Sequence, residues 1–282
     1  MVRQMSWTCG GEGAEPLLLL HGIGSTAEDF TAVRPQLEEQ FLVLAPDLPG
    51  HGGSPALSVR PTIAALADAV EADLDDLDID RVHVLGNSLG GRIAMELAVR
   101  GRALSVVSIS PSGLNIPAER VYQGLAMASS RLLLRGAHHL IGPAARSRVG
   151  RTALLTGLRS TPWRASEVEA RALRAGFAEA EGFWRLLWWA LMVDVPTGLR
   201  RIEVPVLLAQ GTADVLASGQ TPRYLFFVPG ARFFPLWGAG HAPQSDAPES
   251  VIDLVRRATA AAGTAAPVPR VDSTPLPQRR IA

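Results

Sequence analysis

The 282-residue sequence contains no lysine, and all 27 of its basic side chains are arginine. A requirement at one site would not remove lysine from the whole chain, so we attribute this absence to genome composition. The arginines are balanced by 27 acidic residues, which gives a formal net charge of zero. This balance gives no reason to expect nucleic acid or an anionic membrane surface as the main partner, and we expect neither.

Cysteine and long apolar runs are also scarce. The single cysteine, Cys9, excludes an intramolecular disulfide and any structural zinc site built on cysteines. The richest apolar stretch, around residues 183–195, is interrupted by charged side chains and is too short to cross a bilayer. The apolar run at residues 17–20 predicts a buried strand and not a signal peptide. We therefore expect a cytoplasmic protein with no metal and no cofactor.

The chain contains short apolar runs that alternate with longer amphipathic segments. This pattern predicts an α/β protein with a mostly parallel, doubly wound sheet covered by helices. With 47% hydrophobic residues, the chain can bury a sizeable core in one domain. The predicted strands are residues 17–20, 42–45, 82–85, 105–109, 206–209 and 232–236. The clearest predicted helices are residues 63–77, 88–99 and 251–261.

One long segment, residues 112–200, has no predicted strand and is helical, arginine-rich and tryptophan-rich. We interpret it as a helical cap or lid inserted into the core, which then consists of residues 1–111 and 201–262. The alternative is a separate helical domain with no role at a functional site. Residues 263–282 are rich in proline, alanine and arginine and lack periodicity, so they predict a disordered tail.

The stretch Gly86-Asn87-Ser88-Leu89-Gly90 follows a predicted strand and opens a predicted helix. A serine on such a sharp turn projects its hydroxyl above the sheet edge, and small neighbours allow the backbone to turn tightly. The start of the helix also directs backbone N–H groups toward the site, which suits a developing oxyanion. Ser88 is therefore a candidate nucleophile. The alternative is a glycine-rich turn that only packs the helix on the strand.

A serine hydroxyl needs a base to take its proton and an acid to orient that base. Asp214 and His241 follow the strands predicted at residues 206–209 and 232–236, so both are expected at the carboxyl edge of the sheet. Taken alone, either could be a structural residue of its loop. His51 is a rival base, which we rank below His241 because it precedes Ser88 in the chain.

Two glycine-rich turns follow the first two predicted strands. In His21-Gly22-Ile23-Gly24, the backbone N–H of Ile23 is a candidate oxyanion donor together with that of Leu89. The alternative is a strand exit without a catalytic task. In the second turn, residues 47–54, the side chains of Asp47 and Ser54 are expected to hydrogen-bond the loop backbone.

Together these stretches resemble the α/β-hydrolase superfamily over about residues 17–254. The resemblance is to its lidded branch, which includes small-molecule esterases, carbon–carbon bond hydrolases, cofactor-free haloperoxidases, lactonases and epoxide hydrolases. It implies that Ser88 is the nucleophile, His241 the base and then the acid, and Asp214 the orienting carboxylate. It also implies Ile23 and Leu89 as the oxyanion donors. A serine in place of aspartate at the nucleophile disfavours epoxide-hydrolase and haloalkane-dehalogenase chemistry.

Two features depart from this family's pattern. The segment before residue 17 is short, so the usual opening antiparallel hairpin is expected to be reduced to one strand. Residues 215–218 lack the proline that relatives often carry, which leaves the geometry of the loop after Asp214 open.

The cap is expected to shape specificity. Its tryptophans Trp163, Trp184 and Trp188, with Trp189, are candidates to line an apolar pocket above Ser88, and the alternative is that they pack inside the cap.

We expect a small-molecule substrate: a largely apolar ester, lactone, thioester or vinylogous diketone, cleaved through a Ser-His-Asp triad. Two alternatives stay open. One is a cofactor-free perhydrolase or haloperoxidase-like enzyme that uses the same triad, and the other is a non-catalytic ligand-binding protein with the same fold. All these proteins share the motifs described above, so the motifs choose neither the substrate nor the oligomeric state.

Overall fold

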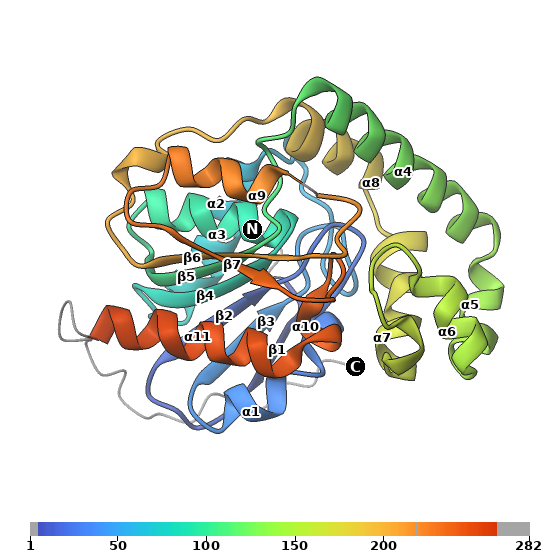
Figure 1. Cartoon of the computed structure of the whole chain (residues 1–282), viewed down its shortest axis with the longest axis horizontal. Coiled ribbons are helices and arrows are strands. Elements are labelled where there is room, and N and C mark those ends of the chain that lie inside the picture. Colours follow the sequence, from blue (N-terminus) through green and yellow to red (C-terminus); the bar gives the residue numbers. More distant parts are fainter. Residues whose placement is uncertain (1–4, 218, 264–282) are drawn as a thin grey trace.

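A seven-stranded sheet crosses the computed structural model, which describes residues 5–217 and 219–263 (Figure 1). The spatial order of the strands is β1-β3-β2-β4-β5-β6-β7. Every neighbouring pair from β3 to β7 is parallel, whereas β1 runs antiparallel to β3. The strands are β1 (Trp7–Gly10), β2 (Pro16–Leu20), β3 (Leu42–Pro46), β4 (Val82–Asn87), β5 (Ala103–Ile109), β6 (Val206–Gly211) and β7 (Arg232–Leu236).

All six strands predicted from the sequence are present, and their bounds differ by two residues or fewer. The central strands are buried on both faces, which is why they read as continuous apolar runs. The strand that the apolar runs did not predict is β1, at the sheet edge, where two of its four residues are exposed. It is a single antiparallel strand, as the short N-terminal segment led us to expect.

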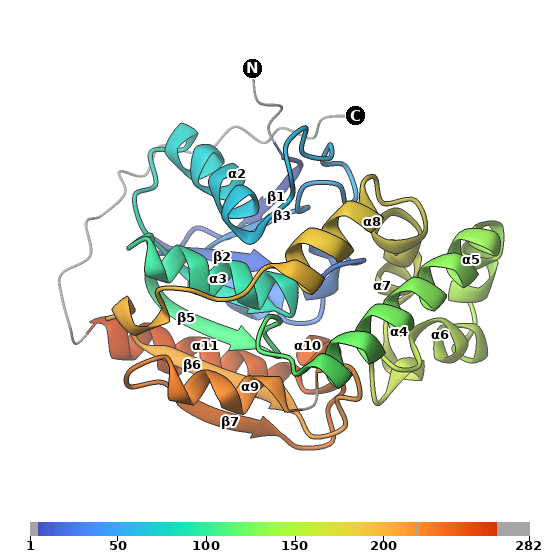
Figure 2. The same cartoon turned by 90° about the horizontal axis from the view of Figure 1, so that it is seen from above.

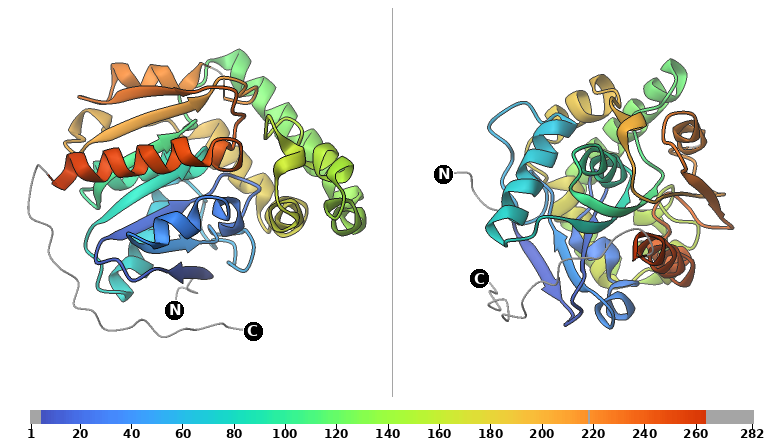
Figure 3. Two further views of the ribbon diagram at one scale, coloured as in Figure 1. Left: turned by 60° about the horizontal axis from the view of Figure 1, so that its bottom comes forward. Right: turned by 90° about the vertical axis from the view of Figure 1, so that its left-hand side faces the viewer.

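Helices cover the two faces of the sheet unequally (Figure 3). Helices α2 (Ile63–Asp76), α3 (Leu89–Val99) and α9 (Gln220–Arg223) lie on one face, where the apolar side chains of α2 and α3 share one buried cluster with the strands. Helices α1 (Arg34–Glu38) and α11 (Pro248–Gly263) lie on the other. The start of α2 is capped by Thr62, whose hydroxyl accepts a hydrogen bond from the Ala65 amide at 3.2 Å.

Residues 112–200, hereafter the cap, leave the core after β5 and return before β6, and among the described residues they add no strand to the sheet (Figure 2). The cap has its own apolar cluster, which includes Phe177 and Phe183. Its α-helices are α4 (Pro117–Gly136), α5 (His138–Ala145), α6 (Arg148–Leu155), α7 (Glu167–Leu173) and α8 (Phe183–Leu186). Two π-helices, Arg174–Ala178 and Leu187–Val193, continue α7 and α8.

The last predicted segment of the chain, residues 263–282, lies mostly outside the described residues. Helix α11 includes Gly263, and the remainder of the predicted disordered tail, residues 264–282, lies outside the described residues.

Candidate active site

Ser88 stands between β4 and α3 with a backbone conformation that L-residues rarely adopt. Its φ of 55° and ψ of −111° turn the chain sharply from strand into helix. The turn needs glycine on both sides: a Cβ on Gly86 would lie 2.3 Å from the carbonyl oxygen of Gly90, and one on Gly90 would lie 2.0 Å from that of Leu20. The predicted strand–turn–helix context of Ser88 is therefore present, with its side chain at the carboxyl edge of the sheet.

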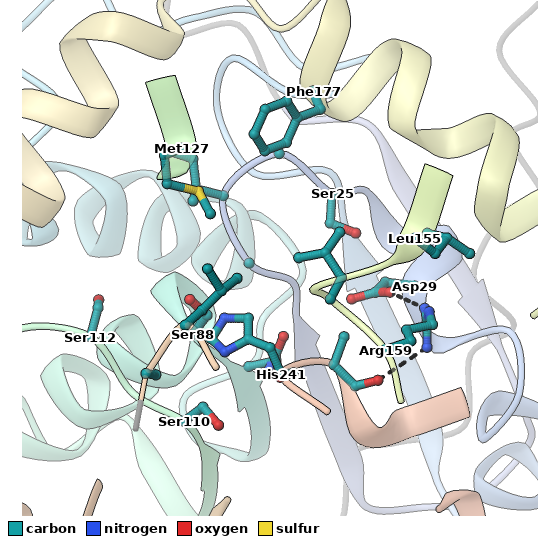
Figure 4. Close-up of a pocket in the computed structure, with 18 of the residues that line it drawn as sticks. Ser25, Asp29, Ser88, Ser110, Ser112, Met127, Leu155, Arg159, Phe177 and His241 are labelled. Carbon is teal, nitrogen blue, oxygen red and sulfur yellow. Dashed lines mark hydrogen bonds and ion pairs between the residues drawn. The ribbon is translucent and has the colours of Figure 1, made fainter. Parts of the chain in front are cut away.

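His241 and Asp214 meet at this edge from two later strands. Asp214 follows β6, His241 follows β7, and the imidazole Nδ1 lies 3.0 Å from the carboxylate Oδ2. Figure 4 shows the His241 ring beside Ser88. Because Nδ1 donates to the carboxylate, Nε2 is the ring nitrogen left to accept a proton.

Asp214 raises the pKa of His241, and His241 lowers the pKa of Asp214. Burial lowers the pKa of His241, but the charge and the hydrogen bond of Asp214 outweigh burial and raise it above the ordinary 6.5. Burial raises the pKa of Asp214, but His241 and further hydrogen-bond donors lower it to about 2. Asp214 is thus ionised at neutral pH and favours protonation of the imidazole, as the partner of a general base must.

Four further contacts hold Asp214 and His241 in place. Asp214 Oδ1 accepts hydrogen bonds from the amides of Leu216 (2.8 Å) and Ala217 (3.0 Å), so the loop closes on the carboxylate without the proline found in relatives. Ser110 donates to Asp214 Oδ2 at 2.8 Å. The Asn87 amide donates to the backbone oxygen of His241 at 2.9 Å, which joins the residue before Ser88 to the loop of the candidate base.

The loop of residues 21–24 lies against Ser88, since a Cβ on Gly22 would be 3.3 Å from the Ser88 Cβ. Two buried histidines hold this loop and the neighbouring turn by their ring nitrogens. His21 Nε2 accepts from the Leu48 amide at 2.8 Å, and His51 Nε2 accepts from the Gly24 amide at 3.0 Å. Burial lowers the pKa of His21 to about 4 and that of His51 to about 3, so both rings are neutral at pH 7.

These contacts make His51 a structural residue of the loop and leave His241 as the histidine beside Ser88. Asp47 and Ser54 bond the backbone of the second turn as expected. Asp47 accepts from the amides of Ala27 and Gly53, each at 2.9 Å, and the Ser54 hydroxyl donates to the Asp47 carbonyl oxygen at 2.5 Å.

A pocket opens over Ser88 between the core and the cap (Figure 4). Its polar floor includes Ser88, His241 and Asn87. Its apolar walls include Ile23 and Leu216 of the core and a larger set from the cap: Met127, Leu155, Leu158, Leu173, Phe177 and Leu191. Side chains of the cap therefore line the pocket over Ser88.

The tryptophans expected in this pocket do not line it. Trp163, Trp184 and Trp188 are 46%, 47% and 58% exposed, and the pocket walls include none of them. The reason is helical phase. Phe183 and Leu187 face the cap interior, and Trp184 and Trp188 follow each by one position, so their side chains leave the helix in another direction. The composition of the cap predicted an apolar pocket, but the side chains that line it are not the predicted tryptophans.

A buried charge cluster at the pocket edge had no signal in the sequence. The Arg159 guanidinium of the cap lies 2.7 Å from an oxygen of Asp29 in the core and 3.2 Å from one of Glu169 in α7. It also donates to the backbone oxygen of Ala242 at 3.1 Å. Gln244 supplies a further donor to Asp29 at 2.7 Å. Arg159 is one of 27 arginines, and its neighbours in sequence do not distinguish it.

Two absences concern residues 5–217 and 219–263, the part of the chain that the structure describes. There, no group of three or more histidine, cysteine or acidic side chains is arranged to hold a metal ion. No helix in that part of the chain has the length and apolar character to span a bilayer.

Comparison with known proteins identifies the family. The model of the alpha/beta hydrolase family matches residues 17–254, and the chain belongs to that family. It is 31% identical over 261 residues to an uncharacterized protein of Mycobacterium tuberculosis, a match that covers 86% of this chain and 74% of that protein. It is 33% identical over 200 residues to epoxide hydrolase EphH of the same organism, which covers 68% of this chain and 92% of the relative.

Among solved structures, the enol-lactonase of Burkholderia xenovorans LB400 superimposes with a TM-score of 0.72 at 23% identity. The superposition covers 90% of this chain and 95% of the lactonase. At that identity the likeness shows the fold alone.

Proposed function

We propose that the protein is a serine hydrolase that cleaves a small, largely apolar ester or lactone through an acyl-enzyme. The observation that carries the proposal is the pair His241–Asp214, joined at 3.0 Å beside a serine in a strained strand-to-helix turn. Ser88 is the nucleophile, His241 the base and then the acid, and Asp214 the carboxylate that orients His241.

The chemistry proceeds in two half-reactions. Ser88 Oγ attacks the acyl carbon while its proton passes to His241 Nε2, and that proton then leaves with the alcohol. Water attacks the resulting acyl-serine, His241 takes a proton from the water, and the acid departs as Ser88 regains its hydrogen. In both steps the negative charge on the carbonyl oxygen is stabilised by the backbone N–H groups of Ile23 and Leu89, which flank Ser88.

Serine favours acyl transfer over epoxide opening, although one relative is named an epoxide hydrolase. Attack of serine on an epoxide would leave an ether, which has no carbonyl carbon for water to attack. An acyl-serine does have one, and its oxygen would lie near the amides of Ile23 and Leu89. The apolar walls formed by Leu155, Phe177 and Leu191 favour an acyl chain without charge.

Active-site labelling with a fluorophosphonate, together with a panel of p-nitrophenyl esters and lactones, tests the proposal. Ser88→Ala is expected to abolish both labelling and turnover. Ser112→Ala, a change at another pocket serine, is the matched control and is expected to keep both. Labelling of Ser88→Ala at the wild-type rate would refute the assignment of the nucleophile. Tight ligand binding by the wild-type protein without turnover on the panel would favour a binding protein instead.

A further inference from the structure

The exposed surface of helices α4, α5 and α6 combines bulky apolar side chains with unpaired arginines. Figure 1 and Figure 2 both place these three helices at one end of the molecule, beyond the sheet. We propose that this surface, hereafter the cap surface, docks on an anionic lipid surface. The inference is independent of the hydrolase chemistry proposed above.

The apolar part of the cap surface is a stripe along α4. Val121, Tyr122, Leu125, Leu132 and Leu133 are all at least half exposed, and Leu133 is 72% exposed. At 100° per residue the five fall within about 120° of arc, along about 18 Å of helix. The opposite side of α4 packs against the cap cluster through Met127 and Leu134. The helix is therefore apolar on both sides, and only one side is covered by the cap.

Two further aliphatic side chains are exposed on the neighbouring helices: Leu140 in α5, and Val149 in α6, which is 81% exposed. Single exposed aliphatic residues are common on protein surfaces, but five along one side of a single helix mark a candidate binding surface.

The charged part of the cap surface has one sign. Residues 112–166 contain eight arginines and a single acidic residue, Glu119, so the zero net charge of the chain conceals a strongly basic region. Glu119 forms an ion pair with Arg223 of the core. Arg135 of α4, Arg146 at the end of α5 and Arg148 of α6 are exposed, and within the described part of the chain none of the three pairs with a carboxylate.

Three other exposed arginines of the chain do have a carboxylate partner. Arg171 pairs with Glu167, Arg174 with Glu179, and Arg257 with Asp253. Among the described residues, Arg135, Arg146 and Arg148 have no such carboxylate, so their charge is available to an external partner.

Charge complementarity selects the occupant. A second copy of the chain docked by the same surface would bring unpaired arginines together, with no acidic side chain of this surface to compensate. A lipid surface with anionic headgroups satisfies both features, since the aliphatic side chains enter the headgroup boundary and the arginines attract phosphates.

Co-sedimentation of the full chain with vesicles tests the proposal without reference to catalysis. The protein is expected to sediment with phosphatidylcholine vesicles that contain phosphatidylglycerol, and to bind pure phosphatidylcholine far more weakly. Raising the salt concentration should weaken binding. The double variant Arg146→Gln/Arg148→Gln should lower the partition coefficient about 30-fold, at roughly fivefold for each arginine near an anionic surface.

Two further variants sharpen the result. Leu125→Asp/Leu132→Asp places charge in the exposed stripe and should abolish binding, with circular dichroism melting to confirm that it folds. Arg171→Gln/Arg174→Gln removes two exposed but paired arginines of the cap and should bind as the wild type does. The proposal is overturned if neither vesicle is bound, or if the control pair loses as much affinity as the test pair. It is also overturned if light scattering finds a dimer that Leu125→Asp converts to monomer while vesicles stay unbound.

Discussion

The guanidinium of Arg159 donates a hydrogen bond to the carbonyl oxygen of Ala242, the residue that follows His241. The Ala242 amide in turn donates to the carbonyl oxygen of Leu158 at 3.0 Å. Beside them, the Asp246 carboxylate accepts from the amides of Gly240, Ser160 and Thr161, at 2.8 to 2.9 Å. The cap and the loop of the candidate base are therefore bonded directly to each other.

We predict that Arg159→Met lowers kcat more than it raises KM. Without the guanidinium the His241 loop loses one anchor, and a small displacement of a base costs about 10- to 100-fold in rate. The change also leaves Asp29 and Glu169 buried without their counterion, which should cost about 3 kcal/mol of stability. Steady-state kinetics with chemical unfolding measures both effects.

Two controls separate positioning by Arg159 from a purely structural role. Arg171→Met removes an exposed cap arginine and should leave kcat and stability nearly unchanged. Arg159→Lys keeps the charge and should recover part of kcat. A destabilised Arg159→Met protein with unaltered kcat would show that Arg159 holds the cap without positioning His241.

The pH profile of kcat/KM should have an acidic limb governed by His241, since the imidazole must be neutral to accept the serine proton. Its pKa is raised, so activity is expected to fall as the pH drops through a midpoint above 6.5. The measurement is kcat/KM for an ester without ionisable groups. A midpoint below 6.5 would contradict the raised pKa, because burial would then outweigh Asp214.

His21 and His51 should make the fold sensitive to mild acid. Their folded pKa values, about 4 and about 3, lie below the value of 6.5 expected in the unfolded chain. The unfolded state therefore binds more protons between these values, so stability is full above pH 6.5 and declines as the pH falls toward 4. The loss at pH 5 is about 2 kcal/mol for each histidine.

Urea unfolding at pH 7.5 and pH 5 measures this loss. His51→Asn should reduce the difference between the two pH values, although the protein is less stable at both. His139→Asn, at an exposed cap position, should not change the difference. Equal stability of the wild type at both pH values would mean that the two histidines are not held neutral.

Acyl-chain preference should follow Phe177 and not the tryptophans. Phe177 lines the pocket and packs on Gly24, where a Cβ would lie 1.8 Å from its ring. Phe177→Ala should favour longer acyl chains, with kcat/KM relative to acetate rising about fourfold for each methylene accommodated. Trp188→Ala, at an exposed site, should leave the preference unchanged. A chain-length preference altered by Trp188→Ala alone would place the acyl group elsewhere.

The sequence predicted the sheet well because parallel buried strands need apolar residues on both faces. The spacing of Ser88, Asp214 and His241 relative to these strands also placed all three at one edge, since successive parallel strands end there. Edge strand β1 was not predicted, because half of its residues are exposed and it has no continuous apolar run.

Residues that meet only through the tertiary fold could not be predicted in this way. Arg159, Asp29 and Glu169 lie up to 140 positions apart and share no motif, and their pairing depends on how the cap returns over the core. For Trp184 and Trp188, composition did not show which side of the helix each residue occupies, and both are exposed. A π-helix begins at Leu187 and shifts the phase of the positions that follow.

The two glycines beside Ser88 have a consequence for the evolution of this protein. Gly86 and Gly90 approach backbone oxygens too closely for alanine, so the turn must be lost if either is replaced. A mutant library selected only for soluble expression should therefore be depleted at both positions, even though neither glycine takes part in bond making. Selection for folding alone therefore preserves the turn that holds Ser88, independently of any selection for activity.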